Sequence, residues 1–285
     1  MQLRTDLALE KHEQFSRTPE GVDLTEQKEN DAVITKITIK NQKGVKALGK
    51  PIGNYITVEV PSFSDNVQTE QITDCVARQI ADLIPESGTV LITGLGNRSI
   101  TPDTLGPMVA DRILATRHIK PELARSAGIE KARSVAVLTT GVLGQTGIES
   151  FDIIKGVCDR IKPSAVIAVD ALASRCLDRL GCTVQLSDSG IEPGAGVGNA
   201  RNEISFKTLG IPVTAIGVPT VVEASDLVLD LTGGVNIKDG QKRQMIVTPR
   251  EIDLLIDRAA KLVADALNRT LQPFIEPKLI TEIMG

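Results

Sequence analysis

The sequence predicts an α/β fold, with a mostly parallel sheet covered by helices on both faces and an N-terminal β appendage. Short, wholly apolar runs separated by helical periods are typical of parallel strands that are buried on both faces. Residues 31–63 differ, because they show the rough apolar–polar alternation of antiparallel strands. We therefore expect one α/β domain over residues 7–285, with the appendage at about 31–63.

The expected elements follow the chain in a regular order. The appendage contains two strands, joined by a Gly- and Lys-rich connection. From residue 69 onward, helices and strands alternate. The strands are expected at 33–39, 55–60, 90–93, 135–138, 165–169 and 213–218, and the helices at about 69–85, 104–113 and 148–161.

The last expected helix has the clearest pattern. Thr248 is predicted to cap it, Pro249 to occupy its first turn and Glu251 to complete a capping box. Apolar residues then recur at helical spacing over 252–267.

Composition excludes several classes of protein. Of the 285 residues, 41% are hydrophobic and 24% charged, and the net charge of −4 argues against a dedicated nucleic-acid binder. No apolar run approaches the roughly 20 residues of a membrane span, and the first residues lack the apolar core of a signal peptide. We expect a cytoplasmic protein that contacts neither nucleic acid nor membrane directly.

Elimination leaves carboxylates as the main candidates for chemistry. The two histidines, His12 and His118, are too few for a His-rich zinc cluster. No GxSxG motif is present for a serine nucleophile. The four cysteines form no CxxC motif and are expected to be reduced. No cofactor is predicted.

Two aspartates are expected at the carboxyl ends of parallel strands, where open α/β sheets gather their chemistry. Asp170 directly follows the apolar run 165–169, and Asp103 lies past the loop after 90–93. Two close carboxyls do not readily ionise together, so one would keep a proton. Such a pair can hydrolyse a peptide, with one member as base and the other as acid.

Position alone leaves a structural alternative open for each aspartate. Asp103 could serve a helix N-terminus, where a carboxylate satisfies free amides and the helix dipole. Asp170 could form a salt bridge to Arg175.

Two glycine-rich loops also have both a structural and a functional interpretation. The loop 94–97 is best interpreted as a tight strand-to-helix turn, since residue 99 is Ser and the GxGxxG pattern is incomplete. The loop 190–199 could bring backbone close to a ligand, or could be a mobile surface loop. Asp188 and Glu192 could support a site there or be solvated.

Seven sequence blocks, in order between residues 94 and 222, resemble the germination protease family, and the resemblance as a whole runs from about residue 3 to 269. Several long blocks together are far more specific than one short motif. The blocks are GLGN at 94–97, TPDTLGP at 101–107, TTGVLGQTG at 139–147, IAVDALASR at 167–175, DSGI at 188–191, PGAGVGN at 193–199 and IGVPTVV at 216–222.

The resemblance implies an atypical aspartate-dependent endopeptidase with Asp103 and Asp170 as the catalytic acids. It also implies a fold similar to that of hydrogenase-maturation endopeptidases, which use acids and a histidine at a nickel site. This sequence has no histidine in a matching block, so no metal is expected. Further residues in or beside these blocks are candidates for the substrate crevice: Asn97, Gly141, Arg175, Asp188, Glu192, Gly196 and Asn199.

The resemblance further implies a zymogen that cuts its own N-terminal segment. The block RTDLALE at 4–10 is similar to the sites that these proteases cut in small acid-soluble spore proteins. Cleavage between Asp6 and Leu7 would make residues 1–6 a propeptide. A homotetramer in the spore core is also implied. The alternatives are a metal-dependent maturation-type peptidase and a catalytically silent binding relative.

Overall fold

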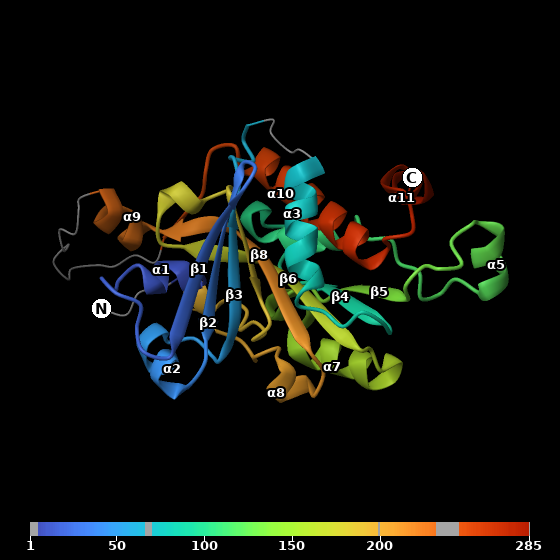
Figure 1. The fold of residues 1–285 in the computed structure, drawn as a ribbon, viewed down its shortest axis with the longest axis horizontal. Coiled ribbons are helices and arrows are strands. Elements are labelled where there is room, and N and C mark those ends of the chain that lie inside the picture. Colours follow the sequence, from blue (N-terminus) through green and yellow to red (C-terminus); the bar gives the residue numbers. More distant parts are fainter. Residues whose placement is uncertain (1–4, 66–69, 199, 232–244, 285) are drawn as a thin grey trace.

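The protein is described by a computed structural model over residues 5–65, 70–198, 200–231 and 245–284. Within these residues the centre of the molecule is a nine-stranded sheet (Figure 1), ordered β1-β2-β3-β7-β8-β6-β4-β5, with β9 paired to β8. The strands are β1 (Val22–Glu29), β2 (Ala32–Ile39), β3 (Gly53–Glu59), β4 (Val90–Gly94), β5 (Val135–Thr139), β6 (Ala165–Ser174), β7 (Thr183–Ser187), β8 (Val213–Glu223) and β9 (Ile246–Val247).

The sheet has a parallel half and an antiparallel half. Strands β8, β6, β4 and β5 are parallel, whereas β1, β2, β3 and β7 pair antiparallel and β7 joins β8. The predicted α/β class and the antiparallel appendage are therefore confirmed. Strands β1 and β7 were not predicted from the sequence.

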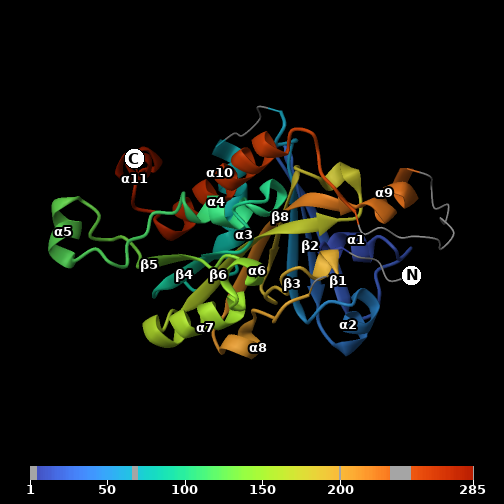
Figure 2. The same ribbon diagram turned by 180° about the vertical axis from the view of Figure 1, so that it is seen from behind.

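Helices cover both faces of the sheet. In Figures 1 and 2, α3, α4 and α10 lie above the parallel strands, and α7 and α8 lie below them. None of the helices in the described ranges combines the length and apolarity needed to cross a bilayer. The helices are α1 (Ala8–His12), α2 (Gln42–Leu48), α3 (Glu70–Ala81), α4 (Leu105–Ala110), α5 (Pro121–Ser126), α6 (Leu143–Thr146), α7 (Ser150–Ile161), α8 (Phe206–Leu209), α9 (Ala224–Leu231), α10 (Ile252–Leu271) and α11 (Pro277–Met284), with 3₁₀ turns η1 (Thr101–Asp103), η2 (Leu177–Arg179) and η3 (Ala195–Val197).

Separate apolar cores hold these layers together. The largest core joins α3, α4 and α10 to one face of the sheet, and a second core joins α7 to the opposite face of β4 and β6. A third core packs α1 and α2 onto the appendage, where Ala8 and Leu9 contact a cluster that includes Ile37, Leu48 and Tyr55. The N-terminal helix is thus part of the folded core.

Strand β6 is longer than the sequence predicts. It continues to Ser174 because β8 pairs with it as far as Val222. Its other neighbour, β4, ends at Gly94, opposite Val169. Asp170 therefore lies within β6, at the first position beyond the end of β4.

The capping box predicted for the last helix is wrong. Helix α10 begins at Ile252, and Glu251 makes no side-chain cap. The Thr248 hydroxyl instead donates to the Thr220 carbonyl of β8 at 2.9 Å. The apolar stripe of α10 is confirmed, because its periodic residues are buried against α3 and α4.

Close backbone packing places α4 directly above the ends of β4 and β6. A Cβ added to Gly106 would lie 2.3 Å from the Leu95 carbonyl oxygen and 2.4 Å from the Val169 carbonyl oxygen. Only glycine allows this approach, which fixes the helix that follows Asp103.

We predict that Gly106→Ala destabilises the protein by at least about 1–3 kcal/mol, because backbone atoms cannot move aside for the methyl group. Thermal unfolding monitored by circular dichroism measures the effect. Gly156→Ala is the matched control, since it lies on an exposed part of α7 with no atom within 4 Å of the added Cβ. Equal melting temperatures for the two variants would contradict the packing argument.

Candidate active site

Asp103 is held by the loop that leaves β4. Its Oδ2 accepts a hydrogen bond from the Asn97 backbone N–H at 2.9 Å, and its carbonyl accepts from the same N–H at 3.0 Å. Gly96 permits this turn at φ 113°, and a Cβ there would lie 2.1 Å from the Asp103 carbonyl oxygen. The carboxyl therefore binds the preceding loop, and Thr104, not Asp103, stands at the start of α4.

Asp170 is buried on β6, with only 6% of its surface exposed. Its Oδ1 accepts a hydrogen bond from the Ala171 N–H at 2.9 Å. No ion pair in the described part of the chain joins it to Arg175, whose backbone N–H binds Glu10 instead. The structure thus leaves the Asp170 carboxyl without the salt bridge that would explain it as a purely structural residue.

Burial shifts the pKa values of both carboxyls upward. The pKa of Asp103 rises to about 6 because burial disfavours its charge, against a smaller opposing effect of the Asn97 N–H. The pKa of Asp170 is raised well above its usual range, first by burial and then by the charges of Asp103 and Asp6. With a pKa of about 6, Asp103 is mostly charged at pH 7, and of the two carboxyls Asp170 is the one whose burial and neighbouring charges favour the protonated form.

Asp6 supplies a third carboxyl. Its N–H donates to the Ala173 carbonyl at 3.0 Å, and its Oδ2 accepts from the Ala173 N–H at 2.9 Å. The Leu95 N–H binds the Val169 carbonyl on the β4 side of β6. Because backbone groups alternate along a strand, Ala173 faces the same side, and Asp6 pairs with β6 where β4 has ended.

The Asp6 carboxyl lies against Gly196 of the glycine-rich loop. A Cβ at Gly196 would be 2.1 Å from Asp6 Oδ2, and the Gly196 N–H binds the carboxyl. Burial raises the pKa of Asp6, while the charge of Lys50 lowers it. The backbone of Gly196 therefore connects this loop to the N-terminal segment.

A cavity of about 720 Å³ opens beside this edge of the sheet. Asp6, Lys50 and Glu192 line it together with Leu172 and Gly217. Gly217 on β8 is paired in register with Asp170, so one lining residue lies on the strand beside that aspartate. Lys50 Nζ donates to the Asp6 carbonyl oxygen at 3.0 Å.

The residues after Asp6 are anchored firmly. Leu7 and Ala8 have no exposed surface, and Glu10 is 1% exposed. The Glu10 carboxylate accepts from the backbone N–H groups of Arg175 at 2.8 Å and Cys176 at 3.1 Å.

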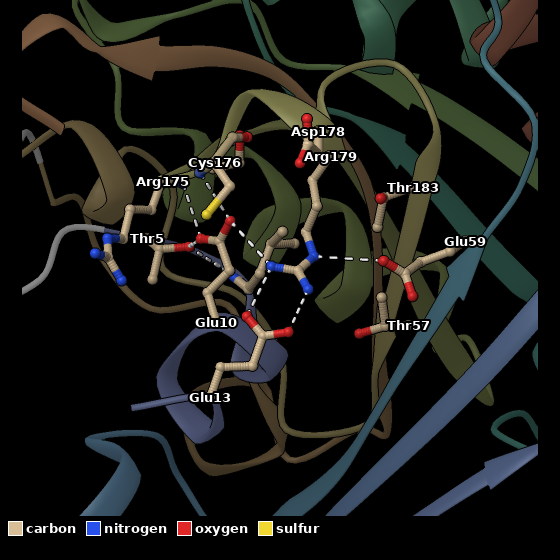
Figure 3. Close-up of polar contacts among 12 residues, drawn as sticks. Thr5, Glu10, Glu13, Thr57, Glu59, Arg175, Cys176, Asp178, Arg179 and Thr183 are labelled. Atoms are coloured by element: carbon tan, nitrogen blue, oxygen red, sulfur yellow. Dashed lines mark hydrogen bonds and ion pairs between the residues drawn. The ribbon is translucent and has the colours of Figure 1, made fainter. Parts of the chain in front are cut away.

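A guanidinium completes the anchor. Figure 3 shows Arg179 between the carboxylates of Glu10, Glu13 and Glu59. Its guanidinium nitrogens lie 3.5 Å from Glu10, 2.5 Å from Glu13 and 3.5 Å from Glu59. This cluster ties α1 to the turn after β6 and to β3. The peptide bond after Asp6 thus lies between two anchored residues. Asp6 is hydrogen-bonded to β6, and Glu10 is bound by the turn that follows β6.

Comparison with known proteins identifies the family of this chain. The family model described as germination protease matches residues 2–238. A germination protease from Caldanaerobacter subterraneus subsp. tengcongensis is 39% identical over 99% of this chain and 98% of its own. One from Clostridium tetani is 41% identical over 97% of both chains. The chain belongs to the germination protease family. It is therefore a peptidase with a role in spore germination.

A more distant bacterial relative and a solved structure were also found. A germination protease from Bacillus thuringiensis subsp. konkukian is 37% identical over 99% of this chain and 84% of its own. A [NiFe] hydrogenase maturation protease, HycI from Thermococcus kodakarensis KOD1, covers 66% of this chain and 98% of its own, at 18% identity and a TM-score of 0.38. That similarity is too low to bear on function.

The other predicted crevice residues of this family member have different surroundings. The Asn97 side chain accepts from Gln145 Nε2 at 2.7 Å, which joins the Asp103 loop to the loop that begins near Gly141. The Asp188 carboxylate binds the backbone and side chain of Asn54 at 2.7 and 2.6 Å and links β3 to β7. Glu192 is exposed at the cavity, and Asn199 lies outside the described residues.

Sequence reasoning missed four residues of this site. Gln145 lies in a family block, but nothing in the sequence indicates its contact with Asn97. Glu10 and Arg179 form a pair 169 positions apart, which no local pattern reveals. Lys50 lies in the connection before β3, where no periodicity marks it. The one usable signal was the processing block itself, since Glu10 ends it.

We predict that Asp103→Asn stabilises the protein at pH 7.5 by roughly 1–2 kcal/mol. The raised pKa of Asp103, about 6, means that its contribution to stability is present below pH 4 and lost as pH rises through 6. The gain from the substitution should therefore vanish near pH 4. Urea unfolding at both pH values measures it.

Asp111→Asn is the control for this prediction. The hydrogen bond from Arg98 lowers the pKa of Asp111, so removing this surface charge should not stabilise the protein. A loss of stability in Asp103→Asn at pH 7.5 would contradict the prediction. It would show that the hydrogen bond from the Asn97 N–H to the charged Asp103 carboxylate stabilises the fold more than burial of the charge destabilises it.

Proposed function

We propose that this family member is an aspartate-dependent endopeptidase that starts the degradation of small acid-soluble spore proteins and cuts its own chain between Asp6 and Leu7. One observation carries the proposal. Asp6 is hydrogen-bonded to Ala173, on the same strand as Asp170, and its charge raises the pKa of Asp170. The residue before the proposed cleavage point is thus bound three positions from Asp170 on the same strand.

The two aspartates divide the chemistry between them. Asp103, charged above pH 6, accepts a proton from a water molecule whose oxygen bonds to the Asp6 carbonyl carbon. Asp170, neutral through burial, donates its proton to the Leu7 nitrogen as the C–N bond breaks. One water is consumed, and a new carboxyl terminus and a new amino terminus result. A proton passes from Asp103 to Asp170 through solvent to restore the pair.

The held segment supports the proposed substrate. Its pattern is threonine, acid, aliphatic, alanine, any residue, glutamate, which is similar to the sites cut in small acid-soluble spore proteins. The acid and the glutamate, Asp6 and Glu10, are both bound by backbone N–H groups of β6 and the turn after it. Residues 1–6 are then a propeptide, and the enzyme acts in the spore core as a homotetramer.

We predict that Asp103→Asn and Asp170→Asn each reduce self-cleavage and cleavage of a small acid-soluble spore protein by at least about 10³-fold. Each removes the acid or the base without changing the shape of the side chain. Mass spectrometry of the intact chain and gel assays of the substrate measure both reactions.

Asp188→Asn is the control, since its carboxylate binds Asn54 away from the pair. Assays with EDTA distinguish the aspartate-dependent mechanism from the metal-dependent alternative. Activity that is lost in EDTA and restored by a divalent metal would favour the metal-dependent peptidase. Normal turnover by either aspartate variant would sink the assignment. A folded wild-type chain that cuts neither itself nor a small acid-soluble spore protein would support the alternative of a catalytically silent binding relative.

We predict that the substrate cleavage rate falls about tenfold per pH unit below pH 6, because Asp103 must be charged to act as the base and its pKa is about 6. Initial rates between pH 4.5 and 8 measure the profile, with circular dichroism to show that the fold persists. A flat rate from pH 7.5 to 5 would exclude Asp103 as the base.

A further inference from the structure

Lys50 reaches the peptide bond after Asp6 with its ammonium group. It follows Gly49, which ends α2 in the left-handed conformation at φ 62° and turns the chain back toward the cavity. Lys50 Nζ donates to the Asp6 carbonyl oxygen at 3.0 Å, which is a good hydrogen-bond distance. This oxygen belongs to the peptide bond that the self-cleavage would break.

The surroundings of Lys50 hold its ammonium group in the protein and shield it in part from solvent. Lys50 is partly buried and lines the cavity with Asp6 and Glu192. Its pKa is lowered by burial and by the nearby charge of Lys11, and the charges of Asp6 and Glu192 oppose this. A lysine held in such a place stabilises negative charge more strongly than a lysine in water does.

We propose that Lys50 is a further catalytic residue, whose ammonium stabilises the negative charge that forms on the Asp6 carbonyl oxygen during cleavage of the Asp6–Leu7 bond. This inference rests on the proposed function, because it concerns the same bond. It adds a third group that the aspartate pair alone does not supply.

The step balances with Lys50 as a donor only. When the water oxygen bonds to the Asp6 carbonyl carbon, the π electrons of the carbonyl move to its oxygen, which the Lys50 N–H holds. Asp103 takes the proton of the water. When these electrons return, the C–N bond breaks and Leu7 nitrogen takes the proton of Asp170. Lys50 ends as it began.

This role leaves the neutral carboxyl free for the leaving group. In a two-aspartate mechanism, the neutral acid has to serve either the carbonyl oxygen or the amine. With Lys50 on the oxygen, Asp170 can keep its proton for Leu7. The cost of losing such a donor is typically about 10²–10³-fold in rate.

The test uses the full chain, with the self-cleavage rate followed by mass spectrometry. Lys50→Met should cut about 10²–10³-fold more slowly than the wild type at pH 7.5. Lys50→Arg keeps a donor and should recover much of the rate. Lys46→Met is the matched control, because it removes the same charge from an exposed site on α2 and should cut at the wild-type rate.

The pH profile gives a second readout. Because the pKa of Lys50 is lowered, the wild-type rate should fall on the alkaline side earlier than an ordinary lysine would allow, and Lys50→Arg should move that fall to higher pH. Lys11, Asp6 and Glu192 face the ammonium and are unchanged in both proteins. An alkaline limb that stays in place in Lys50→Arg would contradict the assignment.

Hydrogen exchange separates catalysis from docking. In the uncut Asp170→Asn chain, adding Lys50→Met should leave the Asp6 and Ala173 amides protected, since their mutual hydrogen bonds do not involve Lys50. Loss of this protection, or a Lys50→Met chain that cuts at the wild-type rate, would overturn the role of Lys50 alone. A wild-type chain that does not cut would overturn the proposed function with it.

Discussion

The unequal length of two neighbouring strands is the constraint on which the site depends. Strand β6 continues to Ser174, while β4 stops opposite Val169. Buried backbone groups on the open side of β6 must find other partners. Asp6 takes those of Ala173, and the Glu10 carboxylate takes the N–H of Arg175. The requirement that anchors the N-terminal segment therefore also attaches it to the end of the strand that carries Asp170.

Electrostatics then gives each group its role. Burial raises the pKa of Asp103 to about 6, and burial with two neighbouring carboxylates raises that of Asp170 well above its usual range. Lys50 brings the opposing charge, which offsets part of the rise that burial causes in the pKa of Asp6, and its ammonium donates a hydrogen bond to the Asp6 carbonyl oxygen. The groups that we propose as base, acid and carbonyl donor thus differ in their tendency to hold a proton because their surroundings differ.

Much of this could be predicted from the sequence, and the failures have physical causes. Apolar runs predicted the parallel strands, and the position of the acids after them made Asp103 and Asp170 the candidate pair. Strand β1 was missed because most of its residues are exposed and polar. Strand β6 was cut short because Asp170 interrupts its apolar run, although it is buried. Thr248 was assigned as a cap because its spacing fits, whereas a neighbouring strand binds its hydroxyl. Lys50 meets Asp6 through tertiary contact only.

The central claim is that the two carboxyls carry different charges at neutral pH. Carbon-13 NMR of chains labelled at the aspartate carboxyl carbon reports each titration, with Asp103→Asn and Asp170→Asn to assign the signals. The account predicts that Asp103 titrates near pH 6 and that Asp170 stays protonated at pH 7. Two carboxyls that both titrate near pH 4 would contradict it.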